Sequence, residues 1–270
     1  MADEVAPLLV LGAGQRCGST LLQRLLCSHP RVRIWGEHVG QLRPLLTAAE
    51  RLRRWTDTNG LAGRNELAHS GYQGFLANVT PERDVVDDAC RAFIETLFAA
   101  PARVAGRPVW GFKEIRYGLP DVLLLRQLFP ALRVMQLVRD PRDVLRSLDE
   151  WEQRPGWTRR NTELALELWT TVAGSFVGVG ADPHLDFILQ VRYEELVVNP
   201  TRWTAAIADH CRLDAALLDP TVFATRVHAA GAGGRLHRSH REWSELPPSL
   251  RALTSDDDVK MVAAAYGYDL

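Results

Sequence analysis

Short apolar runs alternate along this chain with longer segments whose apolar residues recur at helical spacing, and this alternation limits the fold. The runs are bounded by glycine, proline or charged residues, which suits short buried strands. Strands that alternate with helices form a parallel sheet with helices on both faces. The sequence therefore predicts an α/β fold with a central parallel sheet flanked by helices, which 270 residues can build as a single domain.

The positions of the elements follow from the same pattern. Strands are expected at 8–11, 32–35, 109–113, 133–138 and 186–192. Helices are expected at 19–28, 40–54, 81–99, 119–129, 141–151, 162–176 and 200–211. Thr80 is expected to cap the helix at 81–99, with Pro81 at its first position. Segment 56–78 is polar and glycine-rich, and it is expected to be a loop, as is segment 152–160.

A glycine-rich turn follows the first predicted strand. Residues 12–20 are Gly-Ala-Gly-Gln-Arg-Cys-Gly-Ser-Thr, and a predicted helix begins at their end. The glycines allow positive φ and a close approach of a ligand to the backbone. Ser19 and Thr20 add hydroxyl donors beside the free N–H groups of the helix, and Arg16 adds a donor fork suited to phosphate or sulfate. The turn therefore predicts an anion site; the alternative is a turn that only closes a strand–helix corner.

The same turn argues against a nucleoside triphosphate hydrolase. The phosphate-binding loop of those enzymes has a lysine after its last glycine. Here Ser19 follows Gly18, so the lysine that would reach the outer phosphates is missing. A kinase with a relocated lysine remains open.

A second turn follows the strand predicted at 133–138. It reads Arg-Asp-Pro-Arg-Asp-Val-Leu-Arg-Ser at residues 139–147, where Asp140 suits an N-cap and Pro141 the first helical position. Arg139 at the strand tip and Ser147 two turns into the helix could reach one phosphate; the alternative is a solvated charged cluster. Both turns end parallel strands, so one ligand could contact both.

The two turns resemble those of sulfotransferases that use 3′-phosphoadenosine 5′-phosphosulfate (PAPS), and most of all the branch with the tyrosylprotein and bacterial small-molecule enzymes. In that family an Arg-Ser-Gly-Thr-Thr loop binds the 5′-phosphosulfate, and here Cys17 replaces the serine. An Arg and a Ser eight residues apart bind the 3′-phosphate, a spacing that Arg139 and Ser147 keep. The resemblance thus implies donor contacts from Gln15, Arg16, Cys17, Gly18, Ser19, Thr20, Leu21, Arg139 and Ser147.

Further segments resemble the family in the same order. Trp35-Gly36-Glu37 resembles the segment of its catalytic glutamate, and Trp110-Gly111-Phe112-Lys113-Glu114 the strand of its catalytic lysine. Tyr193 matches a tyrosine beside the adenine, while Trp243 and Tyr266-Gly267-Tyr268 resemble the C-terminal helix. The resemblance implies one P-loop-like sulfotransferase domain over residues 1–270. It is weak near 40–80 and 152–182, where acceptor-specificity loops are expected.

The resemblance also implies a division of chemical roles. Glu37 is expected to be the general base, with His38 as a rival, and Lys113 and Arg16 are expected to stabilise the departing phosphate. Lys113 and Lys260 are the only lysines among 32 basic residues. A compact ammonium can follow charge from one oxygen to another, which suits such a role. PAPS would be the donor, the nucleotide product PAP (3′-phosphoadenosine 5′-phosphate) would be left, and no metal is required.

A glycine-rich and then basic segment at 229–241 resembles a flap that folds over the nucleotide in the family. It would bring Arg235, His237 and Arg238 to the donor. The alternative is a disordered surface loop, because such a composition buries little apolar surface.

Composition excludes several other classes. The net charge of −1 provides no global field for nucleic acid or an anionic membrane. The N-terminus lacks a basic region before its apolar run, and no apolar stretch is expected to reach the length of a membrane span, so we expect a cytoplasmic protein. Four scattered cysteines suit a reducing compartment, and Cys17 is either unusually reactive or a small spacer. A homodimer is left open.

The sequence therefore predicts an enzyme that transfers the sulfuryl group of PAPS to a hydroxyl of a small-molecule acceptor. The excess of arginine suggests a GC-rich bacterial genome, and hence a natural product or glycoside as acceptor. Two alternatives remain: a nucleotide-dependent kinase of a small molecule, and a non-catalytic nucleotide-binding module.

Overall fold

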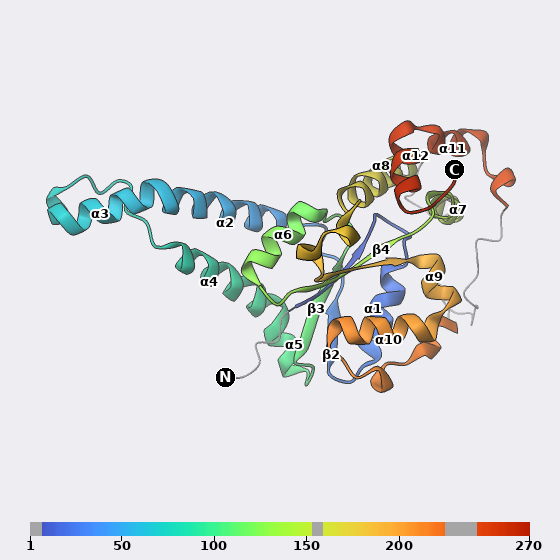
Figure 1. Cartoon of the computed structure of the whole chain (residues 1–270), viewed down its shortest axis with the longest axis horizontal. Helices are drawn as coiled ribbons and strands as arrows, with labels where there is room; N and C mark the ends of the chain where they lie inside the picture. Colours follow the sequence, from blue (N-terminus) through green and yellow to red (C-terminus); the bar gives the residue numbers. More distant parts are fainter. Residues whose placement is uncertain (1–6, 153–158, 225–241) are drawn as a thin grey trace.

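A computed structural model describes residues 7–152, 159–224 and 242–270 (Figure 1). Its centre is a five-stranded sheet in the order β2-β3-β1-β4-β5, and all neighbouring strands pair in parallel. The strands are β1 Leu8–Gly12, β2 Val32–Trp35, β3 Val109–Glu114, β4 Arg133–Val138 and β5 Ile188–Arg192. The predicted α/β fold with a helix-flanked parallel sheet is thus confirmed.

The helices fill the intervals between the strands, much as the alternation predicted. They are α1 Ser19–Ser28, α2 Arg43–Trp55, α3 Leu61–Ser70, α4 Arg83–Ile94, α5 Ala100–Val104, α6 Leu119–Leu128, α7 Pro141–Glu152, α8 Arg159–Ser175, α9 Tyr193–Val198, α10 Pro200–Cys211, α11 Pro248–Arg251 and α12 Asp257–Ala265. Single π-helical turns at Thr56–Gly60 and Glu95–Ala99 extend α2 and α4. Four elements, at 19–28, 32–35, 133–138 and 200–211, have the predicted bounds.

Both faces of the sheet are buried, as β1 shows most clearly. Successive strand residues point to opposite faces. Leu9 and Leu11 belong to a core cluster with residues of α2, α4, α6, α8 and α12, whereas Leu8 and Val10 belong to a second cluster with residues of α1 and α10. Each fully buried leucine contributes roughly 1.5–3 kcal/mol, so the sheet forms a rigid base for the loops at its edge.

Segment 56–78 is where the predicted elements were wrong. It was expected to be a loop, but it is helical from Thr56 to Gln73. Its glycines allow close packing: a Cβ on Gly60 would lie 2.2 Å from Thr80 Oγ1, and one on Gly63 would lie 2.7 Å from the backbone of Asn78. The predicted cap is also wrong, because Glu82 is the N-cap of α4 and Thr80 Oγ1 instead lies 3.0 Å from Thr56 Oγ1.

These helices form a hairpin that extends away from the sheet, with α2 and α3 leading outward and α4 returning (Figure 1). We call residues 43–99 the helical hairpin. Its base is fastened by Arg53, which is 1% exposed and donates hydrogen bonds to Asp87 and to Gln127 of α6. A buried arginine requires such partners, because an unpaired buried charge is strongly destabilising.

One helical stretch, Asn161–Ala181, is long and apolar enough by length and composition to cross a membrane. The expectation that no stretch reaches that length is therefore wrong. In the structure 39% of its most apolar window is buried, and Trp169 and Phe176 lie in the core. The stretch includes α8, which packs against α6, α7 and α12, so it occupies the position of a core helix.

Candidate active site

The two predicted anion turns lie next to each other, because β1 and β4 are neighbouring parallel strands. The N–H of Ala13, just after β1, donates to the carbonyl of Leu137 in β4 at 2.8 Å. Both turns therefore leave the same carboxyl edge of the sheet, where α/β proteins bind their ligands.

The backbone of the first turn bends back through left-handed residues. Gly14, Arg16 and Gly18 have φ values of 73°, 64° and 94°. Such values are uncommon for a residue with a side chain, so Arg16 is held there by its surroundings. Gly18 is the N-cap of α1 and supplies no side-chain acceptor, which leaves N–H groups of the first helical turn free for an anion.

Side chains of the two turns hydrogen bond directly to each other. Arg16 Nε donates to Ser147 Oγ at 2.8 Å, and Arg139 Nη1 donates to the carbonyl of Arg16 at 3.0 Å. The Arg139 guanidinium also lies 4.5 Å from the ring of Tyr193, which packs so closely on Gly18 that a Cβ there would be 2.3 Å from its Cδ2. The structure thus brings together four residues that the resemblance assigned to one nucleotide.

The electrostatics of this cluster suit an anion. Arg139 is 7% exposed, and its nearest carboxylate is Asp143 at 3.8 Å. Its buried Nε has no hydrogen-bond partner within residues 7–152, 159–224 and 242–270. A buried guanidinium donor without an acceptor favours a phosphate or sulfate oxygen as its partner. The donor set therefore fits a nucleotide that carries phosphate and sulfate groups.

The remaining residues of the first turn have different surroundings. Gln15 and Thr20 are half-buried, and Ser19 is buried at the start of α1. The side chain of Leu21 lies in the core, and its N–H donates to the carbonyl of Gly18 at 2.9 Å. Leu21 therefore supports the turn rather than presenting a group to a ligand.

Of the two alternatives for Cys17, a reactive thiol or a small spacer, its surroundings favour the spacer. It is 1% exposed, and its Sγ lies 2.8 Å from the carbonyl of Ala13. Burial raises the pKa of the Cys17 thiol to about 12, so the reactive thiolate is rare at neutral pH.

Glu37 and Lys113 form an ion pair on the other side of β1. Lys113, at the end of β3, is 6% exposed, and its Nζ donates to Glu37 Oε1. Arg116 Nη1 donates to the second carboxylate oxygen at 3.2 Å. The predicted base and one predicted stabilising cation thus contact each other directly.

Glu114, a residue with no role expected from the sequence, holds the turn that carries Glu37. That turn contains Val39 and Gly40 with φ of 58° and 71°, and positive φ is strained for a β-branched residue. The carboxylate of Glu114 is fully buried and accepts hydrogen bonds from Gly40 N at 2.7 Å, Ile115 N at 2.9 Å and Arg116 Nη1 at 3.1 Å.

The pKa of Glu114 shows that these hydrogen bonds dominate. Burial alone would raise it, but donation from Ile115 and Gly40 N–H groups lowers the pKa below its usual value, so the group is ionised. A glutamate directly after the lysine at a strand end was the only signal in the sequence, and such a position does not reveal its contacts.

His38 is placed less well than Glu37 for the role of base. Its Nε2 lies 2.7 Å from the Tyr117 hydroxyl and 3.9 Å from Glu114. Burial lowers the pKa of the His38 imidazole, so the ring is neutral at neutral pH.

Other predicted residues lie elsewhere. Tyr266 donates to the carbonyl of Ala173 and Tyr268 to Glu194, both at 2.8 Å, so the C-terminal tyrosines support the fold. The flap residues Arg235, His237 and Arg238 lie outside the described residues. Among the residues that the structure describes, no group of three His, Cys, Asp or Glu side chains could hold a metal ion.

Comparison with known proteins identifies the class to which this fold and site belong. A sequence model described as the sulfotransferase family matches residues 7–216. This is well over half of the chain, and the protein therefore belongs to the sulfotransferase family.

Particular relatives agree with this assignment. Protein-tyrosine sulfotransferase 1 of Danio rerio is 25% identical over 198 residues, which cover 73% of this chain and 50% of that protein. This chain thus spans about half the length of that curated relative. The fold resembles the sulfotransferase domain of the Synechococcus PCC 7002 olefin synthase, with a TM-score of 0.52, 22% identity and coverage of 99% and 98%. It also resembles the sulfotransferase domain of the curacin biosynthetic pathway, with a TM-score of 0.53, 16% identity and 98% coverage of both chains.

Proposed function

We propose that this protein transfers the sulfuryl group of PAPS to a hydroxyl of a small-molecule acceptor. The observation that carries the proposal is the hydrogen bond from Arg16 to Ser147, together with the contact of Arg139 with the same turn. Two separate anion-binding turns form one continuous donor surface, which suits a ligand with phosphate at one end and phosphosulfate at the other.

In this proposal the first turn binds the 5′-phosphosulfate through Gln15, the backbone N–H groups of residues 16–20 and the hydroxyls of Ser19 and Thr20. Arg139 and Ser147 bind the 3′-phosphate, and the ring of Tyr193 lies beside the adenine. The flap residues Arg235, His237 and Arg238 remain candidates for further donor contacts. The donor supplies an activated sulfuryl group, and no metal is assigned a role.

The reaction proposed is an in-line displacement at sulfur. A new bond forms between the acceptor oxygen and sulfur, while the bond from sulfur to the bridging oxygen of the phosphate breaks. Glu37 takes the proton of the acceptor hydroxyl, and Lys113 and Arg16 stabilise the charge left on the phosphate. Lys113 is ion-paired with Glu37, so in this proposal the pair separates before Glu37 takes the proton, and the ammonium then turns to the phosphate oxygen.

Two observations favour a small-molecule acceptor, and one favours a protein. The natural-product context in the names of two structural relatives favours a small molecule. The name of the Danio rerio relative instead favours a tyrosine hydroxyl of a protein, so that class is the alternative acceptor. The arginine-rich composition favours a bacterial tailoring enzyme, and the four scattered cysteines favour the cytoplasm.

Ligand-dependent melting tests the donor. We expect PAP to raise the melting temperature without added metal, because a ligand at about 100 times its Kd stabilises the folded state by about 2.7 kcal/mol. Magnesium–ATP at the same concentration should raise it less, since the turn lacks the lysine of triphosphate-binding loops. Stabilisation by magnesium–ATP with no effect of PAP would favour the kinase instead.

A further inference from the structure

Two cations meet at the carboxylate of Glu37, and each of them bonds a different oxygen. Lys113 Nζ donates to Oε1, and Arg116 Nη1 donates to Oε2 at 3.2 Å. The side chain of Glu37 is 30% exposed, so the carboxylate is open to an acceptor. In the proposed reaction Lys113 turns to the phosphate, which frees Oε1 and leaves Arg116 as the cation on Oε2.

Arg116 is fastened to the fold by a second acceptor. The same Nη1 donates to Glu114 Oε1 at 3.1 Å, and one guanidinium nitrogen with two N–H groups can serve both carboxylates at once. Glu114 is fully buried, and it also accepts hydrogen bonds from the N–H groups of Gly40 and Ile115. The carboxylate that anchors Arg116 is therefore fixed by the backbone on both sides of the site.

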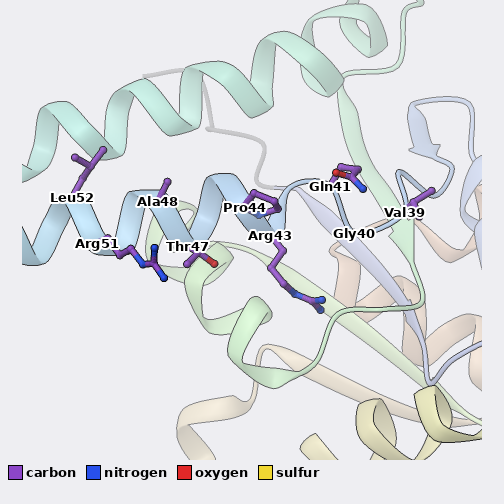
Figure 2. Close-up of a pocket in the computed structure, with 9 residues that line it drawn as sticks. All are labelled: Val39, Gly40, Gln41, Arg43, Pro44, Thr47, Ala48, Arg51 and Leu52. Atoms are coloured by element: carbon purple, nitrogen blue, oxygen red, sulfur yellow. The ribbon is translucent and has the colours of Figure 1, made fainter. Parts of the chain in front are cut away.

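The backbone and the stem of Arg116 are held as well. Arg43 Nη2 donates to the carbonyl of Arg116 at 2.5 Å, and the Arg43 guanidinium is itself bonded to both carboxylate oxygens of Asp121 at 2.7 Å. Figure 2 shows Arg43 projecting from the start of α2, with Gly40 in the turn just before it. A Cβ on Gly40 would lie 3.8 Å from Cβ and Cδ of Arg116, so the stem passes close to the turn that follows Glu37.

A general base needs its charge compensated without losing the oxygen that takes the proton. A partly buried carboxylate that lost its ammonium partner would be left with an unpaired charge, which is costly. The guanidinium of Arg116 can fill this role, because an arginine in a protein keeps its protons and accepts none. A cation that stays on Oε2 compensates the charge and leaves Oε1 free.

We propose, building on the proposed function, that Arg116 is the positioning residue of the general base. It holds Oε2 of Glu37 while Lys113 turns to the phosphate and Oε1 takes the proton of the acceptor hydroxyl. In this step the acceptor oxygen forms its bond to sulfur and its proton passes to Oε1. The electron pair of the broken bond between sulfur and the bridging oxygen stays on the phosphate. Arg116 touches neither the acceptor nor the donor and acts only through Glu37.

Crystal structures of complexes with PAP test the proposal without an acceptor. In the wild-type complex we expect Lys113 on a phosphate oxygen of PAP, with Glu37 still on Arg116 at about the present 3.2 Å. In the Arg116→Gln complex the Glu37 carboxylate should adopt another rotamer.

Two results of this experiment would overturn the proposal alone. In one, Glu37 leaves Arg116 in the wild-type complex, and in the other Lys113 stays on Glu37 although PAP is bound. A protein that binds no PAP would instead overturn the proposed function and this proposal with it, so the two failures can be told apart.

Kinetics distinguishes a positioning role from a purely structural one. Transfer from labelled PAPS is measured with small phenols and alcohols as probe acceptors. Arg116→Gln should lower kcat about 10–100-fold at a nearly unchanged KM for PAPS, because a misplacement of about 1 Å in a reacting group has an effect of this size. Arg116→Lys should recover most of the loss, since its ammonium still supplies the charge. The control Arg83→Gln removes an arginine paired with Asp57 on the helical hairpin and should leave kcat unchanged.

A double variant tests whether Arg116 acts through Glu37. In the Glu37→Gln background, Arg116→Gln should change kcat by less than about twofold, because the base that it positions is already gone. A full second loss in the double variant would overturn the proposal. So would an Arg116→Gln enzyme whose melting temperature falls while kcat per folded molecule stays at the wild-type value, because Arg116 would then have a structural role alone.

Discussion

The two halves of the site are held in place by different physical means. The donor half, at the ends of β1 and β4, consists of Arg16, Arg139 and Ser147, which hydrogen bond to one another or to the backbone. The acceptor half, at the ends of β2 and β3, consists of the ion pair of Glu37 with Lys113 and a strained turn held by Glu114. In the proposed function, the side chains of the donor half already contact one another, whereas the charges of the acceptor half have to separate before Glu37 can take a proton.

The largest effect is expected from the acceptor half. Glu37→Gln should lower the rate of sulfuryl transfer by about 10²–10⁴-fold, because the amide cannot accept the proton, while PAP affinity should remain nearly unchanged. Lys113→Ala should lower the rate by about 10²–10³-fold and also weaken PAPS binding. Kinetics with labelled PAPS measures the rate and calorimetric titration measures the affinity, so together they distinguish the two variants. Glu167→Gln on α8 is the control. A Glu37→Gln enzyme with wild-type turnover would exclude Glu37 as the general base and favour His38.

Glu114→Gln tests whether the strained turn matters for turnover. Its amide cannot match the carboxylate toward the N–H of Gly40 and Arg116 at once, so Glu37 should lose its position. We expect kcat to fall about 10–100-fold at a nearly unchanged KM for PAPS, in line with about 1–3 kcal/mol for a buried polar group left without its partner. If only the melting temperature falls while kcat per folded molecule stays constant, Glu114 has a structural role alone.

A smaller effect is expected from the donor half. Arg139→Ala should weaken PAP binding about tenfold or more, since hydrogen bonds to charged groups contribute about 1.5–3 kcal/mol. Binding of adenosine 5′-phosphosulfate, which lacks the 3′-phosphate, should weaken less. Ser147→Ala should likewise weaken PAP binding more than it weakens binding of adenosine 5′-phosphosulfate.

The loss of affinity should not be confined to the ligand that carries the 3′-phosphate. Because Arg139 and Ser147 both hydrogen bond to Arg16, part of the loss should also reach the ligand without the 3′-phosphate. Calorimetric titration of both ligands, with Arg202→Ala on α10 as control, measures the difference. Equal losses for the two ligands would show that the pair does not recognise the 3′-phosphate.

The smallest effect concerns stability and arises from the imidazole of the acceptor half. Burial lowers the pKa of His38 below the ordinary value of 6.5. As pH falls through 6.5, the unfolded chain takes up a proton that the folded chain does not, so the free energy of unfolding falls. The slope from this one group is at most about 1.4 kcal/mol per pH unit. Urea denaturation at pH 7.5 and 5.5 should show a smaller difference for His38→Gln than for wild type; an unchanged difference would contradict the assignment.

The sheet and its flanking helices could be predicted from the sequence because their signals are local. Five of the six residues at 133–138 are buried, and the run is followed directly by a charged turn with a proline, so its signal is local. The helix at 56–73 could not be predicted in the same way. Gly60 and Gly63 look like helix breakers in sequence, and only the close approach of Thr80 and Asn78 explains why they are there.

The site could be predicted in its members but not in its contacts. The motif spacing and the family resemblance indicated Arg16, Arg139 and Ser147, but the sequence placed the two turns only at ends of parallel strands and did not show that these strands are neighbours. The role of Glu114 could not be seen, since it depends on the N–H of Gly40, which is 74 residues away in the chain. The pairing of Glu37 with Lys113 likewise requires β2 and β3 to be neighbours, which the element pattern does not determine.

The burial of Cys17 has a consequence for redox chemistry. Burial raises the pKa of the Cys17 thiol to about 12, so the thiolate is rare at neutral pH. Peroxide and disulfide reagents attack the thiolate, and the thiol is also 1% exposed. A cysteine at the centre of the anion turn therefore leaves the protein without an oxidation-sensitive point there, and donor binding should survive oxidising conditions that would inactivate an enzyme with an exposed thiol in the same position.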